Sequence, residues 1–305
     1  MSAQTPQFGD LSIGKAAADE FVRPPQLPAL FRKRAARIEA LAENSPTAGF
    51  LRLMGKVFAA QAAASEAGGP VEAPSAEALA RAGEHVMPPL SPDGWTPTAT
   101  YREALRLIAA DIPRDALPSP TVEALNGIAA ASDDHLDTLA RAFLSDDGVL
   151  PQWQAEVLFA AAALQVEFAR IAALIPPQSL APLDAAGLCP VCGSHPVAGV
   201  VVADAAYGRR YLTCGLCSTS WHHVRVACVS CGGEKNIAYH EVEGGNGTAK
   251  CETCDDCEGY SKLFYQMKDM GIEALCDDLG TLALDLLVRN AGWKRHAPNP
   301  FVPTL

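Results

Sequence analysis

Nine of the ten cysteines lie within 69 residues, from Cys189 to Cys257, whereas the 188 residues before them contain none. Eight of the nine form four C-x-x-C pairs: Cys189/Cys192, Cys214/Cys217, Cys228/Cys231 and Cys254/Cys257. A C-x-x-C turn directs two thiolates to one side of a tight loop, and two such turns joined by a hairpin provide four thiolates in a tetrahedron. The pattern therefore predicts metal-binding modules, with Pro190 and Gly193 shaping the first turn.

The gaps between the pairs predict how they combine. There are 21 residues between Cys192 and Cys214 and 22 between Cys231 and Cys254, but only ten between Cys217 and Cys228. The residue pattern of each long gap predicts a strand, a turn and a second strand. The near-equal gaps favour sequential pairing, the first pair with the second and the third with the fourth, and an interleaved cross-brace is the alternative. The predicted metal ligands are Cys189, Cys192, Cys214, Cys217, Cys228, Cys231, Cys254 and Cys257.

The same pairs could instead be redox motifs or disulfides. A thioredoxin-like site has one C-x-x-C at the start of a helix in a β-α-β setting. Here there are four, on hairpin-like segments, so metal binding is the prediction. Tetrahedral sulfur sites suit zinc or a single iron ion, and the ligand set alone does not choose between them.

Two cysteines remain outside the four pairs. Cys251 forms an overlapping C-x-x-C with Cys254, so this pair competes with Cys254/Cys257, which better matches the length of the first hairpin. Cys251 is then either a reactive thiol near the site or, more simply, a partly buried strand residue. Cys276 shares an apolar helix face and is predicted to be a small core residue.

Four histidines lie within or beside the cysteine region. His222 and His223 follow Trp221, and eight cysteines already complete two sites. We therefore expect these two histidines to flank a buried tryptophan rather than to bind metal, and interpret His195 and His240 in the same way.

Charge limits the partners of the chain. With 24 Lys and Arg against 35 Asp and Glu, the net charge of −11 argues against a broad surface for nucleic acid or anionic membrane. The metal-binding region is locally more basic, at Arg209, Arg210, Arg225 and Lys235. These residues predict a solvated strand face or a docking surface for an acidic partner.

No membrane insertion is expected. The most apolar run, residues 157–175, is interrupted by Gln165, Glu167 and Arg170, which indicates a buried helix rather than a membrane span. The N-terminus has no basic stretch followed by an apolar one, so we expect no signal peptide and a cytoplasmic protein. In that compartment paired cysteines are more often metal ligands or redox groups than structural disulfides.

The residues before the cysteines favour helices. Apolar residues recur at helical spacing, and Ser45-Pro46, Thr96-Pro97 and Ser119-Pro120 each predict a helix start. The most apolar helix is predicted over 152–175, at the centre of the helical part. The Pro-rich segment 176–187 predicts a linker and a domain boundary.

Taken together, three stretches resemble one family closely: "CPVCGSHP", "RRYLTCGLCSTSWHHVRVACVSCG" and "CDDCEGYSKLFYQ". They are similar to the FdhE-type formate dehydrogenase accessory proteins. The likeness continues through "DDLGTLALDLL…NPF" and extends more weakly into "FRKRAARIEALAENSPTAGFLRL". Cys251 departs from the family pattern, which leaves the ligands of the fourth turn open.

The resemblance implies rubredoxin-like iron-binding modules, a helical N-terminal region, and a role in making formate dehydrogenases active in the cytoplasm. It implies contact with the catalytic subunit of that enzyme. Carried over residue by residue, it makes the eight paired cysteines the ligands of two metal ions, with iron favoured and zinc as the alternative.

The expected fold is α+β: an all-α helical N-terminal domain, two tandem small rubredoxin-like or zinc-ribbon-like metal modules, and a C-terminal helix near 272–291. The expected boundaries are 1–180 for a helical docking domain, 184–226 and 227–264 for the two modules, and 265–305 for the C-terminal helix and tail.

Three functions compete at this level. The leading hypothesis is a cytoplasmic maturation factor for formate dehydrogenase, which is not itself an enzyme because the sequence has no G-x-S-x-G, P-loop or dinucleotide fingerprint. A nucleic-acid-binding zinc-ribbon protein is the second, which the negative charge disfavours. The third is a rubredoxin-like electron-transfer protein, and it is compatible with the first.

Overall fold

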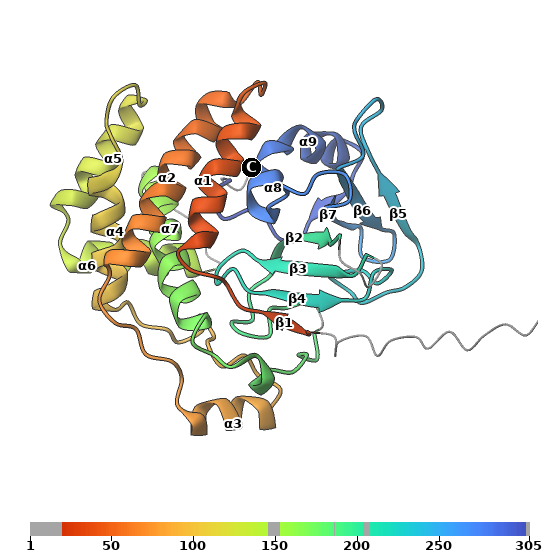
Figure 1. Ribbon diagram of the computed structural model, residues 1–305, viewed down its shortest axis with the longest axis horizontal. Helices are drawn as coiled ribbons and strands as arrows, with labels where there is room; N and C mark the ends of the chain where they lie inside the picture. The colour runs from red at the N-terminus through yellow and green to blue at the C-terminus, as the bar shows by residue number, and fades with distance from the viewer. Residues whose placement is uncertain (1–19, 146–152, 186, 204–207, 303–305) are drawn as a thin grey trace, which may run out of the picture.

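A group of helices packs beside one mixed β-sheet in the computed structural model (Figure 1), which describes residues 20–145, 153–185, 187–203 and 208–302. The first 19 residues of the expected helical domain, the start of its predicted central helix at residue 152, and the last three residues of the tail lie outside these ranges. The helices of the N-terminal part are α1 (Ala29–Ala42), α2 (Ala48–Ala67), α3 (Ala76–Glu84), α4 (Ala99–Asp111), α5 (Ser119–Ala130), α6 (Asp133–Leu144) and α7 (Gln154–Ala172).

Helix α7 forms the centre of the helical part, as its composition predicts. Nearly every residue from Val157 to Ala172 is buried, and α2, α4, α5 and α6 pack against it. The buried carboxylate of Glu167 accepts hydrogen bonds from the hydroxyls of Thr98 and Thr100 at 2.8 and 2.6 Å. A charged residue is tolerated in this apolar helix because both of its oxygens are paired.

The Ser/Thr-Pro signals place three helices to within a few residues. Helix α5 begins at Ser119 with Pro120 in its first turn, and α2 begins at Ala48, two residues after Pro46. Helix α4 is capped by Thr98 rather than by Thr96, since the Thr98 side chain accepts from the Tyr101 amide at 3.0 Å.

The strands form a single sheet that contains both cysteine modules. They are β1 (Val22–Arg23), β2 (Pro196–Val201), β3 (Arg210–Cys214), β4 (Ser220–His223), β5 (Ile237–His240), β6 (Ala249–Cys254), β7 (Gly259–Tyr265) and β8 (Lys294–Arg295). Their order is β1-β4-β3-β2-β7-β6-β5, with β8 also paired to β7.

Two pairings tie distant parts of the chain together. Strands β2 and β7 pair in parallel, with Gly199 opposite Leu263, and so join the hairpin of the first module to that of the second. The N-terminal segment contributes β1, whose Val22 lies opposite Trp221 of β4. The two modules therefore share one sheet.

The C-terminal segment expected to be helical near 272–291 is helical, but a break at Thr281 divides it into α8 (Ala274–Gly280) and α9 (Leu282–Asn290). The fully buried Lys262 ammonium donates to the carbonyls of Asp278 and Thr281 at 2.8 and 3.2 Å, which takes up backbone acceptors at the break. A buried ammonium requires such partners, and the helix is interrupted where it finds them.

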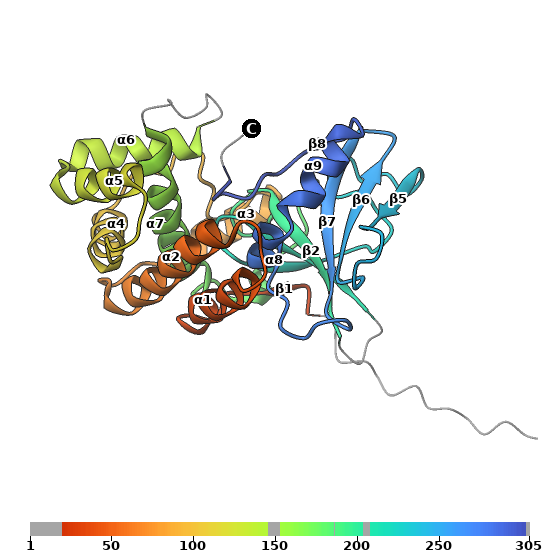
Figure 2. The same ribbon diagram turned by 90° about the horizontal axis from the view of Figure 1, so that it is seen from above.

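Helix α8 lies between α1 and the sheet (Figure 2) and links the two parts of the molecule. The fully buried Arg34 of α1 pairs with Glu273 at 2.9 Å, and Arg37 pairs with Asp277. Burial opposes ionisation of Glu273, but Arg34 and hydrogen bonds from Cys276 together outweigh it and lower the pKa of that carboxyl. Within the described ranges, no helix is both long and apolar enough to cross a bilayer.

Candidate metal centres

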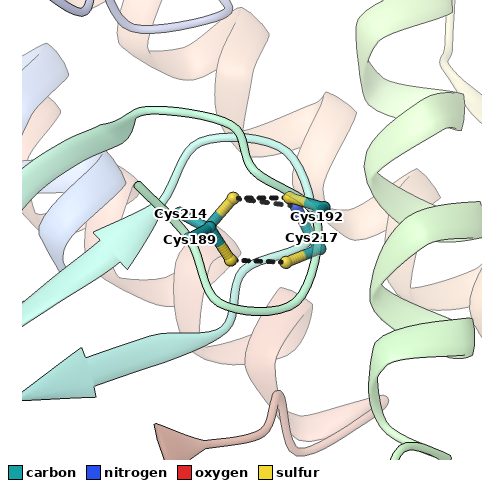
Figure 3. Close-up of side chains that lie close together, drawn as sticks. All are labelled: Cys189, Cys192, Cys214 and Cys217. Atoms are coloured by element: carbon teal, nitrogen blue, oxygen red, sulfur yellow. Dashed lines mark hydrogen bonds between the residues drawn. The ribbon is translucent and has the colours of Figure 1, made fainter. Parts of the chain in front are cut away.

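The structure brings the eight paired cysteines together in two groups of four. Cys189, Cys192, Cys214 and Cys217 form the first site, and Cys228, Cys231, Cys254 and Cys257 form the second. In each group one Sγ atom per residue lies within 4.8 Å of the others. Figure 3 shows the four sulfurs of the first site pointing toward one another. This is the sequential pairing that the spacing favours, and the cross-brace is not formed.

The first turn of each site has the same backbone geometry. In the first site, the Gly193 amide donates to the Cys189 carbonyl at 2.8 Å, and Gly193 has φ +76°. In the second site, the Gly232 amide donates to the Cys228 carbonyl at 3.0 Å, with φ +72° at Gly232. A residue with a Cβ is strained at such φ values, so glycine directly after the second cysteine permits the turn.

The sulfur distances fit tetrahedral metal coordination. The separations are 3.4 and 3.5 Å between facing sulfurs in the first site and 3.7 Å for both facing pairs in the second. A disulfide bond is about 2.05 Å long, whereas metal–sulfur bonds of about 2.3 Å give tetrahedral edges of about 3.8 Å. The donor set of both sites therefore fits a thiophilic ion.

The electrostatics of the first site call for a cation. Burial raises the pKa of Cys189 and of Cys217 well above that of a free thiol. Burial also opposes ionisation of Cys192, but hydrogen bonds from the neighbouring thiols outweigh it and lower the pKa of Cys192. Four thiolates packed together repel one another, so a bound cation is what would allow all four to ionise.

Backbone amides provide further stabilisation of the sulfurs. The amides of Leu216 and Cys217 point at the Cys214 sulfur at 3.3 and 3.4 Å. Such contacts stabilise thiolate charge without a cationic side chain, and they orient the ligand.

The second site is more open than the first. All four cysteines of the first site are 0% exposed. In the second, Cys254 and Cys228 are buried, Cys257 is partly exposed and Cys231 is exposed. The two sites therefore share ligand chemistry but differ in access to solvent.

Cys251 and Cys276 lie apart from both groups. Cys251 is on β6, fully buried against Tyr260 and Leu284, and burial raises its pKa to about 12. The rival pair Cys251/Cys254 is therefore not used. Cys276 is a buried residue of α8 whose thiol donates to the Arg34 carbonyl at 3.4 Å. Neither is poised as a reactive thiolate.

The four histidines considered from the sequence do not join the sulfur groups. Trp221 is buried, His222 packs edge-on against Tyr211, and His223 contacts the Ala227 carbonyl at 3.2 Å. His240 contacts the Thr253 hydroxyl at 2.9 Å. The exposed His195 lies in a cleft between the two sites.

Sequence reasoning missed His296. Its Nε2 atom lies 3.5 Å from the Cys257 sulfur, because β8 pairs with β7 and brings Lys294 opposite Gly259. Burial, and then the nearby His195, lowers the pKa of His296. The two residues are 39 positions apart in the sequence, so no local motif predicts the contact.

Arg210, one of the four basic residues expected on a solvated strand face or docking surface, does not lie on the surface. It is fully buried and forms a bidentate pair with Glu252, with its Nη1 at 2.8 and 3.1 Å from the two carboxylate oxygens. It joins the first module to the second rather than facing solvent. The expected basic face loses its central member.

Family models match the chain in three consecutive segments. They are described as "FdhE, N-terminal" for residues 19–185, "FdhE, central domain" for 188–225 and "FdhE, C-terminal domain" for 226–302. The central and C-terminal segments each contain one four-cysteine group.

Similar proteins span almost the whole chain. A "Protein FdhE homolog" of Rhizobium meliloti is 35% identical over 306 residues, which cover 99% of both chains. A "Protein FdhE" of Salmonella paratyphi A is 33% identical over 280 residues, or 91% of this chain and 89% of that one. The crystal structure of the FdhE protein from Pseudomonas aeruginosa superposes with a TM-score of 0.82 at 32% identity, covering 92% of this chain and 98% of that one. This chain belongs to the FdhE family.

Proposed function

We propose that the chain is a maturation factor for formate dehydrogenase that acts in the cytoplasm, binds the catalytic subunit of that enzyme and holds a metal ion in each four-cysteine site. The observation that carries the proposal is the pair of preformed tetrathiolate sites in a chain of this family. A reducing compartment suits this arrangement, because it keeps thiolates available to metal.

Iron is the proposed metal at both sites, with zinc as the alternative. Four thiolates in a tetrahedron suit either ion. Bound iron would supply one-electron chemistry, whereas zinc would supply only structure. The chain itself contributes the eight sulfurs, a glycine in the first turn of each site and the amides that point at Cys214.

The chain is proposed to act as an accessory protein and not as an enzyme. Its sequence has none of the nucleophile or phosphate-binding motifs named above. Among the described residues, the clusters of metal-ligating side chains are the two sulfur sites. The helical part, which is joined to the sheet through Arg34 and Arg37, is the proposed docking surface for a client subunit.

Deleting the gene for this chain from its source organism is expected to abolish formate dehydrogenase activity while the catalytic subunit is still made. The measurement is formate oxidation in cell extracts, together with immunodetection of the catalytic subunit. Plasmid-borne wild-type chain should restore activity, and Cys276→Ala should restore it equally because that thiol lies away from both sites. Normal activity in the deletion strain would contradict the proposed function.

Client binding is tested separately by affinity purification of the tagged chain from cells that express the catalytic subunit. Co-purification of that subunit in stoichiometric amount is the expected result. Its absence, with the chain intact and loaded with metal, would contradict the proposed partner.

An electron-transfer role is the second candidate. The observation that favours it is the exposure of Cys231 and Cys257, since a redox partner could approach the second site closely. A visible absorption spectrum that bleaches on reduction would support this role. A colourless protein with two bound zinc ions would exclude it.

A further inference from the structure

We propose that the second four-cysteine site is the place where metal enters and leaves this chain, with His296 as the donor that receives the ion, and that the first site keeps its metal. The inference rests on the proposal above that both four-cysteine groups hold metal, and it goes further by giving the two sites different roles. The proposed ligand is a thiophilic divalent cation.

The first site is enclosed from two sides. On one side the segment after α3 covers the Cys189 turn: the Leu90 amide donates to the Val191 carbonyl at 2.9 Å, and a Cβ on Gly193 would lie 3.0 Å from the Pro88 ring. On the other side Gln165 of α7 donates to the Gly215 carbonyl at 2.6 Å. Its four cysteines belong to the main hydrophobic core. Release of metal from this site therefore requires core packing to open.

In the described part of the chain the second site is less enclosed, although Gly187 lies against the Val229 carbonyl of its first turn. Cys231 is exposed and Cys257 is partly exposed. The neighbouring strand β5 has Ala238, Tyr239 and His240 exposed to solvent. A chelator or an incoming ion can reach these sulfurs without breaking the core.

A fifth donor stands beside the second site. The Nε2 atom of His296 is 3.5 Å from the Cys257 sulfur, and the side chain is exposed. The imidazole occupies space left by a glycine, since a Cβ on Gly259 would lie 1.7 Å from that Nε2 atom. Imidazole nitrogen binds zinc and iron well, so His296 can hold an ion while a thiolate ligand is replaced.

A cleft leads to this donor. It is small, with a cavity volume of about 20 Å³, and is lined by His195, Ser230, Tyr260, Ser261 and His296, among others. A smaller adjoining cavity is lined by Cys228, Cys254 and again His296. The histidine therefore stands where the cleft meets the sulfurs of the second site.

Exchange through such a site proceeds one ligand at a time. A thiolate leaves a four-coordinate ion slowly when no other ligand replaces it. A neutral nitrogen nearby would replace the leaving thiolate, so that the ion would stay four-coordinate. As each sulfur leaves the metal it takes up a proton from water, so complete release consumes protons. Among the described residues neither sulfur group includes a histidine, but His296 contacts the Cys257 sulfur of the second site.

The test uses full-length chain loaded with two zinc ions and the chromogenic chelator 4-(2-pyridylazo)resorcinol in excess. We expect one equivalent to be released about ten-fold faster than the other or more, a barrier difference of about 1.4 kcal/mol. Iodoacetamide added during the fast phase, followed by peptide mass spectrometry, should label Cys228, Cys231, Cys254 and Cys257 and leave the first site unlabelled.

Two variants test the histidine. His296→Ala should slow the fast phase about five-fold or more and leave the slow phase unchanged, without lowering the number of zinc ions bound. Gly259→Ala should act in the same direction, because the new Cβ displaces the imidazole without removing it. His240→Ala is the matched control, since His240 lies in the same module and contacts Thr253 instead of a sulfur. Fast release unaffected by His296→Ala would contradict the role of that histidine.

The failures of this inference and of the proposed function are distinguishable. Fewer than two zinc ions bound at saturation would contradict both. Two bound ions released at equal rates, or labelling of the first site in the fast phase, would overturn only the difference between the sites. None of these measurements depends on formate dehydrogenase activity.

Discussion

Replacing Cys217 with alanine is expected to leave one metal ion per chain instead of two and to reduce the soluble yield sharply. Cys217 is a fully buried cysteine of the first site, and a metal ion bound there would hold two turns of the sheet together. Structural zinc contributes about 10–16 kcal/mol to zinc-finger peptides, which is comparable to the whole stability of a typical domain, about 5–15 kcal/mol. Elemental analysis of purified protein, normalised to amino-acid content, measures the effect.

The chain provides matched controls for this substitution. Cys251→Ala and Cys276→Ala remove buried thiols that belong to neither sulfur group, so both should keep two metal ions. Cys231→Ala should also lose one ion but remain more soluble than Cys217→Ala, because its site is at the surface. Two ions retained in Cys217→Ala would contradict the assignment of the first site.

Replacing Asp278 with alanine is expected to lower the free energy of unfolding by about 3–5 kcal/mol. The Asp278 side chain is fully buried between two cations, Lys262 at 3.2 Å and Arg295 at 2.5 Å, and also accepts from Asn299 at 3.0 Å. Its removal leaves Lys262 and Arg295 to share one carboxylate, that of Asp285 at 2.5 and 3.0 Å, so one buried positive charge loses its counter-ion. Urea unfolding followed by circular dichroism, with both metals bound, measures the loss.

The same carboxylate predicts how acid affects stability. Burial opposes ionisation of Asp278, but Lys262 and Arg295 outweigh it and lower its pKa in the folded chain. A lowered folded pKa stabilises the fold above the ordinary aspartate pKa, and this contribution is lost as the pH falls below it. Wild type should therefore lose its advantage over Asp278→Ala as the pH falls below about 4.

An exposed ion pair serves as the control for Asp278. Glu258 lies 3.7 Å from Lys294, with both side chains more than 70% exposed. Glu258→Ala should leave the unfolding midpoint nearly unchanged, since solvent screens such pairs. Equal destabilisation by Glu258→Ala and Asp278→Ala would show that the buried network has no special role.

The cysteine sites could be predicted because their geometry is local. A C-x-x-C turn followed by glycine needs only a few residues to adopt its shape, and the gap lengths restrict which turns meet. The predicted sequential pairing and the use of Cys257 instead of Cys251 both follow from such short-range constraints. The helices of the N-terminal part could be predicted for the same reason, because the apolar spacing and the Ser/Thr-Pro start of each helix lie within one continuous segment of the sequence.

What could not be predicted depends on pairing between distant segments. Arg210 looks like a surface residue until its partner Glu252 is known, 42 residues away. The parallel contact between β2 and β7, and the place of His296 beside Cys257, likewise need the whole sheet. The break between α8 and α9 follows from the buried Lys262, which reaches the helices from strand β7.

The N-terminal stretch that resembles the family more weakly packs directly against a C-terminal stretch of the same resemblance. The stretches "FRKRAARIEALAENSPTAGFLRL" and "DDLGTLALDLL" are far apart in sequence but meet where α1 packs on α8. Arg37 in the first pairs with Asp277 in the second, and Asp278 beside it holds Lys262 and Arg295. These segments join the helical part to the metal-binding sheet.

The central claim is that the chain binds two metal ions through eight thiolates. Its most direct test is elemental analysis of anaerobically purified chain, combined with a visible spectrum and with thiol counting after denaturation. We predict two ions per chain, with iron giving a rubredoxin-type spectrum, and ten free thiols once the metal is removed. Metal-free protein in which the paired cysteines are joined as disulfides would contradict the account.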